Sequence, residues 1–249
     1  MNVGKICVTA MVAIFVWCGT PQAATGIQAG TYDSLYAGVY DGITPIAPLL
    51  TKKSIGLGTF DGLDGEMIIV DGGIFQVKGD GTVIRPPATI TTPFITIADF
   101  SAKSTAPVPA GNNFEQLGRT IDSLVPELNI PLAIRIHGTF SYVRTRSFPK
   151  QRRPYKLLTE IIRTQPEFTA QDVTGTLVGF RYPEYLRGIN AVGYHLHFIS
   201  DDATFGGHVL ELKTTSGTID VEKLTEVRII LPATDKTFLT TPFPLAHEQ

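Results

Sequence analysis

The sequence predicts an α+β fold with mixed or antiparallel sheets in two closely joined halves, of which the C-terminal half is barrel-like. Apolar, β-branched runs are separated by Gly, Asp and Pro at the short intervals typical of hairpins. Two segments instead repeat their apolar residues with the period of a helix. Residues 101–113 are polar, contain proline and have no period, so the boundary is expected there. The predicted units are a β-rich half at 24–105 and an α+β half at 106–249, packed as one compact body.

The N-terminal half is expected to consist of short strands joined by tight turns. Residues 71–73 (DGG) and 79–81 (GDG) are of the types that adopt turn conformations at little cost. A short helix is predicted at residues 44–51. The strands are predicted at residues 54–60, 66–70, 74–78, 82–85 and 93–100.

The C-terminal half is expected to hold two helices and the longest strands. Apolar residues recur on one face of residues 114–125, with Asn112 or Asn113 as the N-cap. A second apolar stripe at residues 157–162 follows Pro154, a residue that suits the first turn of a helix. The strands are predicted at residues 132–146, 173–181, 191–200, 207–213 and 226–231.

Residues 1–23 have the composition of a secretory signal peptide. Lys5 precedes an apolar run of about a dozen residues, and a Gly-Thr-Pro segment with small residues follows it. The run is shorter than the roughly 20 apolar residues that a membrane span needs. We therefore expect cleavage near Ala23 or Ala24, a secreted or periplasmic protein, and no stable membrane association after cleavage.

Composition excludes several classes of partner and cofactor. The formal net charge is −2, with acids and bases interspersed, which does not indicate a nucleic-acid partner. Both cysteines, Cys7 and Cys18, fall in the expected signal peptide, so the mature chain is expected to have no disulfide and no thiolate ligand. Residues 56–59 (GLGT) do not match the spacing of a dinucleotide-binding loop or a P-loop, so no organic cofactor is expected.

Three histidines lie close together at His195, His197 and His208. The first two are two residues apart in a predicted strand and therefore share a face. Residues 200–204 (SDDAT) are turn-forming, and a hairpin that closes about their centre pairs His197 with His208, with Cβ atoms about 5 Å apart. Three neutral imidazoles with an open fourth position form a standard catalytic zinc site. The sequence predicts a metal site with Zn²⁺ as the expected ion, although imidazole also suits iron, copper, nickel and manganese.

Five blocks of sequence, in order, resemble the α-acetolactate decarboxylase family. The blocks are residues 58–66 (GTFDGLDGE), 140–146 (FSYVRTR), 178–181 (VGFR), 193–202 (GYHLHFISDD) and 207–210 (GHVL). The resemblance runs from about residue 35 to about residue 231, nearly the whole expected mature chain. It implies a zinc enzyme that converts 2-acetolactate to (R)-acetoin and carbon dioxide in the acetoin and butanediol pathway, and it suggests a homodimer.

The resemblance also assigns site residues. The family's zinc-ligand histidines fall on the three histidines already named, its site arginine on Arg146, its site glutamate on Glu66 and its substrate-binding threonine on Thr59. From the residues alone Arg144 and Arg146 are equivalent, because they are two apart in one predicted strand. The family places a second glutamate near its C-terminus, over the metal. Here the tail after residue 238 is short, and its one carboxylate, Glu248, is the candidate for that role.

The chemistry of such a decarboxylation agrees with these residue types. Loss of carbon dioxide from a 2-hydroxy-3-keto acid leaves electrons that must rest on the ketone oxygen as an enediolate. A metal that chelates the hydroxyl and carbonyl oxygens lowers that barrier as a Lewis acid. A guanidinium at Arg146 is a fixed cation for the developing oxyanion. Arg146 or a carboxylic acid, directly or through water, is the candidate proton donor to one face of the enediolate.

Two other functions fit the histidines. A cupin-like β-barrel oxygenase also carries His-x-His and a later histidine, but its usual glutamate after the pair is replaced here by Asp201 and Asp202 in the turn. A periplasmic metal-binding module that only stores or senses metal is the non-enzymatic alternative. Arg146 together with Glu66 discriminates against storage, because a cation beside the metal opposes metal binding. His137, within a strand, and His247, in the tail, are expected to be structural or unused.

Overall fold

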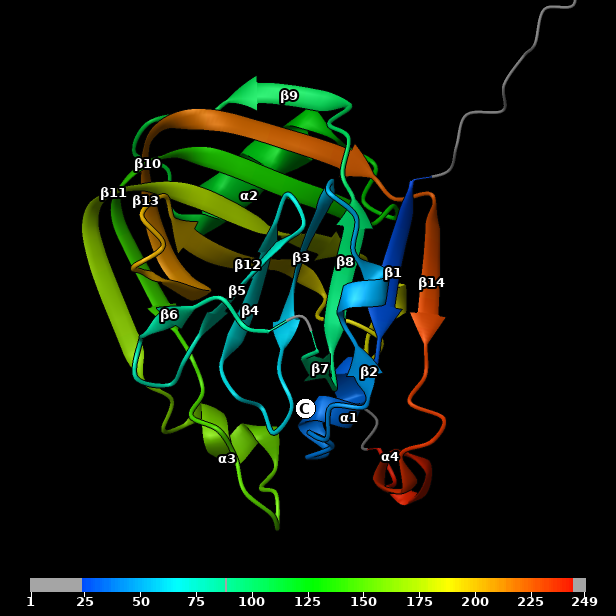
Figure 1. Cartoon of the computed structure of the whole chain (residues 1–249). Helices are drawn as coiled ribbons and strands as arrows, with labels where there is room; N and C mark the ends of the chain where they lie inside the picture. Colours follow the sequence, from blue (N-terminus) through cyan, green and yellow to red (C-terminus); the bar gives the residue numbers. More distant parts are fainter. Residues whose placement is uncertain (1–23, 88, 244–249) are drawn as a thin grey trace, which may run out of the picture.

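The computed structural model describes residues 24–87 and 89–243, and its strands form two main sheets (Figure 1). The α+β class is confirmed, with mostly sheet and few helices. The signal peptide predicted at 1–23 and the tail residues His247 and Glu248 lie outside the described residues. Within the described ranges, no helix is long and apolar enough to span a membrane.

The first sheet has seven strands in the order β14-β1-β8-β3-β4-β5-β6. Its pairs are antiparallel except β1 with β14, which is parallel. The strands predicted between residues 54 and 100 are confirmed, each with ends shifted by at most two residues. The members are β1 (Thr25–Ala29), β3 (Ser54–Thr59), β4 (Glu66–Val70), β5 (Gly73–Val77), β6 (Val83–Ile84), β8 (Ile95–Asp99) and β14 (Glu226–Ile230).

The helix predicted at residues 44–51 is wrong for most of its length. β2 (Thr44–Pro45) pairs with β7 (Thr91–Thr92) as a small separate sheet, and η1 (Ala47–Leu49) forms a single 3₁₀ turn. Pro48, in the middle of the predicted helix, explains the difference, because it has no N–H to donate to the carbonyl of Thr44 and in a helix its ring would clash with that carbonyl.

The second sheet has five strands in the order β10-β11-β12-β13-β9, and β10 also pairs with β13. These pairings close β10 to β13 into a ring, and the barrel-like form of this half stays a prediction. β11 and β13 are longer than predicted, because β10 offers hydrogen-bond partners along its whole length. The members are β9 (Ser104–Pro107), β10 (Leu132–Arg146), β11 (Glu167–Tyr182), β12 (Gly193–Ser200) and β13 (Gly206–Lys223).

Two strands have places in the sheets that the sequence did not suggest. β9 lies inside the stretch expected to be an irregular boundary, where it pairs with β13. β14 follows β13 in the chain yet returns to the first sheet beside β1. The division into 24–105 and 106–249 stays a prediction.

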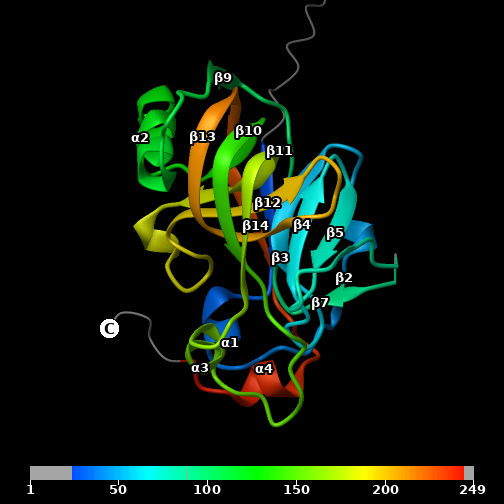
Figure 2. The same ribbon diagram turned by 90° about the vertical axis from the view of Figure 1, so that its left-hand side faces the viewer.

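Helices cover the outside and one end of the molecule. α2 (Phe114–Leu124) begins at a capping box between Asn113 and Gln116, so Asn113 is the cap of the two asparagines that the sequence offered. It lies beside the second sheet (Figure 2), where its buried Leu117 and Ile121 pack in one cluster with side chains of that sheet. α3 (Leu158–Ile162) confirms the second helix, but Pro154 precedes it rather than forming its first turn. α3 contacts α1 (Tyr32–Tyr36). The remaining helical segments are η2 (Glu184–Leu186) and α4 (Lys236–Thr240).

The two sheets share one apolar core at a seam between them. Buried side chains from the first sheet, such as Ile55 and Ile68, belong to the same cluster as Val178, Phe180 and Ile199 of the second. β4 contacts β12 and β3 contacts β11 across this seam. The histidine-bearing strand β12 is therefore held against the strand that begins with Glu66.

Candidate active site

The predicted histidine hairpin is present, with His197 of β12 paired directly to His208 of β13. Gly207, just before His208, has φ +129, and a Cβ there would lie 2.6 Å from the carbonyl oxygen of Arg146. Glycine is therefore required for β13 to approach β10 this closely. The ring centroids of the three histidines are 4.8, 5.1 and 5.3 Å apart.

Hydrogen bonds and burial leave the three imidazoles neutral. His197 Nδ1–H donates to the carbonyl oxygen of Met67 at 2.8 Å, which turns Nε2 toward the other histidines. His195 Nε2 lies 3.1 Å from His208 Nδ1. Burial lowers the pKa of His197 to about 3, with a further lowering by Arg146. Burial also holds the pKa of His195 and His208 well below the usual value, and the positive charge of Arg146 and the neighbouring imidazoles lower both pKa values further.

These residues fit a metal ion. One ligand nitrogen from each histidine lies within 4.8 Å of the others. His195 Nδ1 and His197 Nε2 are buried without any hydrogen-bond partner among the described residues. Such orphaned nitrogens cost free energy unless something binds them. A metal bound by neutral imidazoles would satisfy them, and the carbonyl of Met67 already fixes the tautomer of His197 as second-layer partners of metal ligands do.

The structure places Arg146 at the histidines and Arg144 away from them. Arg146 pairs in register with His208, and its Nη2 donates toward His208 Nε2 at 3.3 Å. Its Nη1 donates to Gln165 Oε1 at 2.6 Å. Arg144 instead forms ion pairs with Glu167 and Glu211, whose side chains are 41% and 56% exposed. The two arginines, equivalent in the sequence, therefore have different surroundings.

Glu66 and Thr59 face each other across the pair of strands β3 and β4. The Glu66 carboxylate lies 3.5 Å from His197 Nε2, with the Glu66 side chain only 6% exposed. Burial raises the pKa of Glu66 to about 7, and the positive charge of Arg146 opposes that rise. The Thr59 hydroxyl is buried and donates to the carbonyl of Gly65 at 2.7 Å.

All six of these described residues line one cavity of about 40 Å³, room for about one water molecule. Larger hollows lie elsewhere, such as one of about 580 Å³ beside β1, but they lack this set of ligands and acid–base groups. The other lining residues close the cavity with an apolar wall that the sequence did not reveal: Tyr32, Leu35, Gly58, Leu63, Phe94, Phe148 and Leu158. Gln165, the partner of Arg146, was also missed. Gly58 and Leu63 belong to the block at 58–66 that carries the resemblance, whereas the others have no local signal, because long-range packing brings them here.

Comparison with known proteins agrees with this geometry. Residues 27–244 match the family model for alpha-acetolactate decarboxylase. The alpha-acetolactate decarboxylase of Methanosarcina mazei is 42% identical over 83% of this chain and 72% of its own length. That of Methylococcus capsulatus is 40% identical over 82% of this chain and 79% of its own length. The crystal structure of alpha-acetolactate decarboxylase from Bacillus subtilis strain 168 superposes with a TM-score of 0.83 at 34% identity, covering 88% of this chain and 93% of that one. The chain belongs to the alpha-acetolactate decarboxylase family, a family of carboxy-lyases.

Proposed function

We propose that this protein decarboxylates 2-acetolactate to (R)-acetoin and carbon dioxide in the acetoin and butanediol pathway, with Zn²⁺ as its metal. The observation that carries the proposal is the convergence of three neutral imidazoles, one guanidinium and one carboxyl group in a single buried cavity. Membership of the family supports the choice of substrate.

Different residues of the chain would bind the metal, stabilise negative charge and deliver the proton. His195, His197 and His208 would hold the ion, which when bound withdraws electron density from the hydroxyl and carbonyl oxygens of the substrate. Arg146, braced by Gln165, supplies a fixed positive charge beside the place where the oxyanion develops. Arg146 and Glu66 are the candidates to deliver the proton that completes acetoin.

The rest of the cavity wall controls water. Leu35, Leu63, Phe148 and Leu158 are apolar and buried, so they exclude solvent from the reacting carbon atoms. Exclusion of water strengthens the attraction between Arg146 and developing negative charge. Thr59, which also lines the cavity, is the candidate for a hydrogen bond to the substrate.

The cupin-like alternative gains no support from the turn that follows His197. Asp202 accepts hydrogen bonds from Ser200 and Thr204, so it is engaged in the turn. Asp201 lies against His137 on the surface. Neither aspartate replaces the glutamate that a cupin-like oxygenase would add to its histidines.

The function is tested by incubating the purified protein with racemic 2-acetolactate and measuring acetoin and its enantiomer. We expect (R)-acetoin from the zinc-loaded protein, loss of activity after chelation, and recovery when zinc is returned. Chelation should also lower the melting temperature, because a ligand that binds only the folded state stabilises it. A zinc-loaded protein that forms no acetoin would contradict the proposed reaction, and activity that survives complete removal of metal would contradict the metal's role.

We also propose that the protein is exported and that its signal peptide is cleaved. When the full chain is expressed in a bacterium with two membranes, we expect the mature protein in the periplasm or the medium, beginning near Ala24 or Thr25. N-terminal sequencing of the fractionated protein measures this. A chain that keeps Met1 and stays in the cytoplasm would contradict the proposal.

A further inference from the structure

The turn between β3 and β4 carries a proposed site residue at each end. Thr59 is the last residue of β3, Glu66 is the first of β4, and the two are paired. Residues 60–65 connect them. The position of the Glu66 carboxylate relative to His197 therefore depends on the path of this short connection.

Residues 60–65 form an irregular turn in which several backbone angles are unusual. Gly62, Leu63 and Gly65 all have positive φ, at +72, +53 and +89. For Leu63 that conformation is unfavourable, so contacts from outside the turn must hold it. At Gly65 a Cβ would lie 2.2 Å from the carbonyl oxygen of Val77, which shows that the turn packs directly on the backbone of β5.

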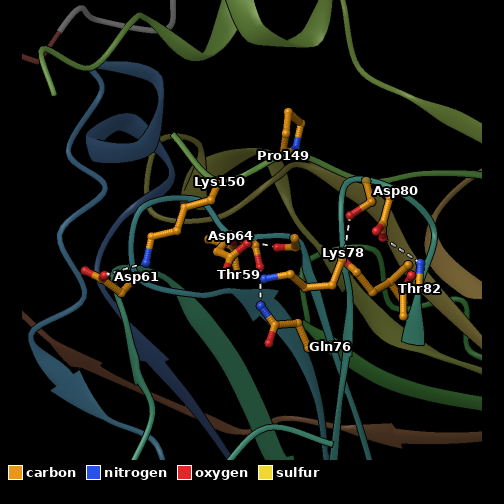
Figure 3. Close-up of polar contacts among 12 residues, drawn as sticks. Thr59, Asp61, Asp64, Gln76, Lys78, Asp80, Thr82, Pro149 and Lys150 are labelled. Carbon is orange, nitrogen blue, oxygen red and sulfur yellow. Dashed lines mark hydrogen bonds and ion pairs between the residues drawn. The ribbon is translucent and has the colours of Figure 1, made fainter. Parts of the chain in front are cut away.

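Asp64 is held by two side chains from the end of β5 (Figure 3). Gln76 Nε2 donates to the backbone carbonyl of Asp64 at 2.5 Å. Lys78 Nζ forms an ion pair with the Asp64 carboxylate at 2.5 Å. The Asp64 side chain is 15% exposed and that of Lys78 is 33% exposed, so the pair is partly shielded from water. Asp64 lies two residues before Glu66, and both its backbone carbonyl and its carboxylate are therefore held in place.

A second ion pair in the same turn provides a comparison. Lys150 Nζ lies 3.4 Å from Asp61, and the two side chains are 55% and 46% exposed (Figure 3). Exposed pairs of this length contribute little, typically about 0–1 kcal/mol. The turn therefore has a tight ion pair near Glu66 and a loose one at the opposite end.

We propose that Lys78, through its ion pair with Asp64, is a positioning residue that holds the Glu66 carboxylate at His197 for the decarboxylation. Lys78 does not line the cavity, so it acts through the backbone of the turn. The inference rests on the function proposed for Glu66 above. Small displacements of a catalytic group are costly, since a misplacement of about 1 Å lowers rates by as much as about 100-fold.

The test compares Lys78→Met with Lys150→Met, each of which removes one lysine from an ion pair in the turn. We expect Lys78→Met to lower kcat about tenfold or more per bound zinc, with KM and zinc content little changed. Lys78→Arg should restore most of the loss, because it keeps the charge. Lys150→Met should keep the wild-type kcat. Hydrogen exchange of the amides at residues 60–65 should quicken in Lys78→Met and not in Lys150→Met.

A double-mutant cycle with Glu66→Gln distinguishes the positioning role of Lys78 from the catalytic role proposed for Glu66. If Lys78 acts by placing Glu66, then Lys78→Met has little further effect on kcat once Glu66→Gln is present. An equal loss of kcat in both backgrounds, or equal losses for the two lysine variants, would overturn the positioning role. Full activity of Glu66→Gln alone would instead overturn the role of Glu66 and leave the decarboxylase function to the other residues.

Discussion

Replacement of His197 by alanine is expected to abolish zinc binding and to lower kcat/KM for 2-acetolactate by at least about 1,000-fold. A Lewis acid contributes several kcal/mol to charge stabilisation in the transition state, and each 1.36 kcal/mol is about tenfold in rate. His197 is 1% exposed and its Nε2 has no hydrogen-bond partner in the described part of the chain. Elemental analysis of the purified variant and steady-state acetoin formation measure the two effects.

His137→Ala is the matched control for this experiment. His137 is on β10 of the same sheet, but its side chain is 57% exposed and faces Asp201 rather than the cavity. We expect this variant to keep wild-type zinc content and activity. Because His197→Ala also leaves the carbonyl of Met67 unpaired, His208→Gln serves as a second ligand variant, and near-ultraviolet circular dichroism confirms folding. Full zinc occupancy in both ligand variants would refute the proposed site.

Replacement of Arg146 by glutamine is expected to lower kcat by about 100-fold or more while zinc stays bound. The removal of one preorganised group that stabilises developing negative charge typically costs about 100- to 1,000-fold. Arg146→Lys should recover only part of this loss, because an ammonium group does not reach Gln165 and His208 together as the guanidinium does. Single-turnover rates on zinc-loaded protein measure the chemical step directly.

Arg144→Gln is the control for the arginine. It is two residues away on β10 and its ion pairs with Glu167 and Glu211 lie near solvent. Its loss should change the free energy of unfolding by about 1 kcal/mol at most and leave kcat unchanged. If Arg146→Gln keeps the wild-type kcat, or loses its zinc, then Arg146 does not act by stabilising charge.

The register of the histidine hairpin was predictable because it depends on local rules. Alternation places His195 and His197 on one face, and a turn at residues 200–204 sets His197 opposite His208. The strand predicted at 132–146 is correct at both ends, since apolar, aromatic and β-branched residues recur along its whole length. These features need no knowledge of the rest of the chain.

The choice between Arg144 and Arg146 was not predictable from the pattern of residues. A register shift between Arg144 and Thr145 changes how β10 pairs with β13, so Arg144 meets Glu211 while Arg146 meets His208. Such a bulge alters where a side chain points without leaving a sequence signal. The place of Tyr32 in the cavity was not predictable for a related reason. Tyr32 is the first residue of α1, far from the other site residues in sequence, and only the packing of the fold brings it there.

The hydrogen bond from His197 to the carbonyl of Met67 has a wider consequence, because it joins the second sheet to the backbone of the first. The candidate site therefore lies at the seam between the two sheets, with its imidazoles on the second sheet and Glu66 on the first. The separation of the two sheets at this seam depends on the size of buried side chains that do not line the cavity, such as Ile55, Val178 and Ile199. We therefore expect that substitutions that repack these core residues change the distance between the imidazoles and Glu66, and with it the rate of the proposed reaction.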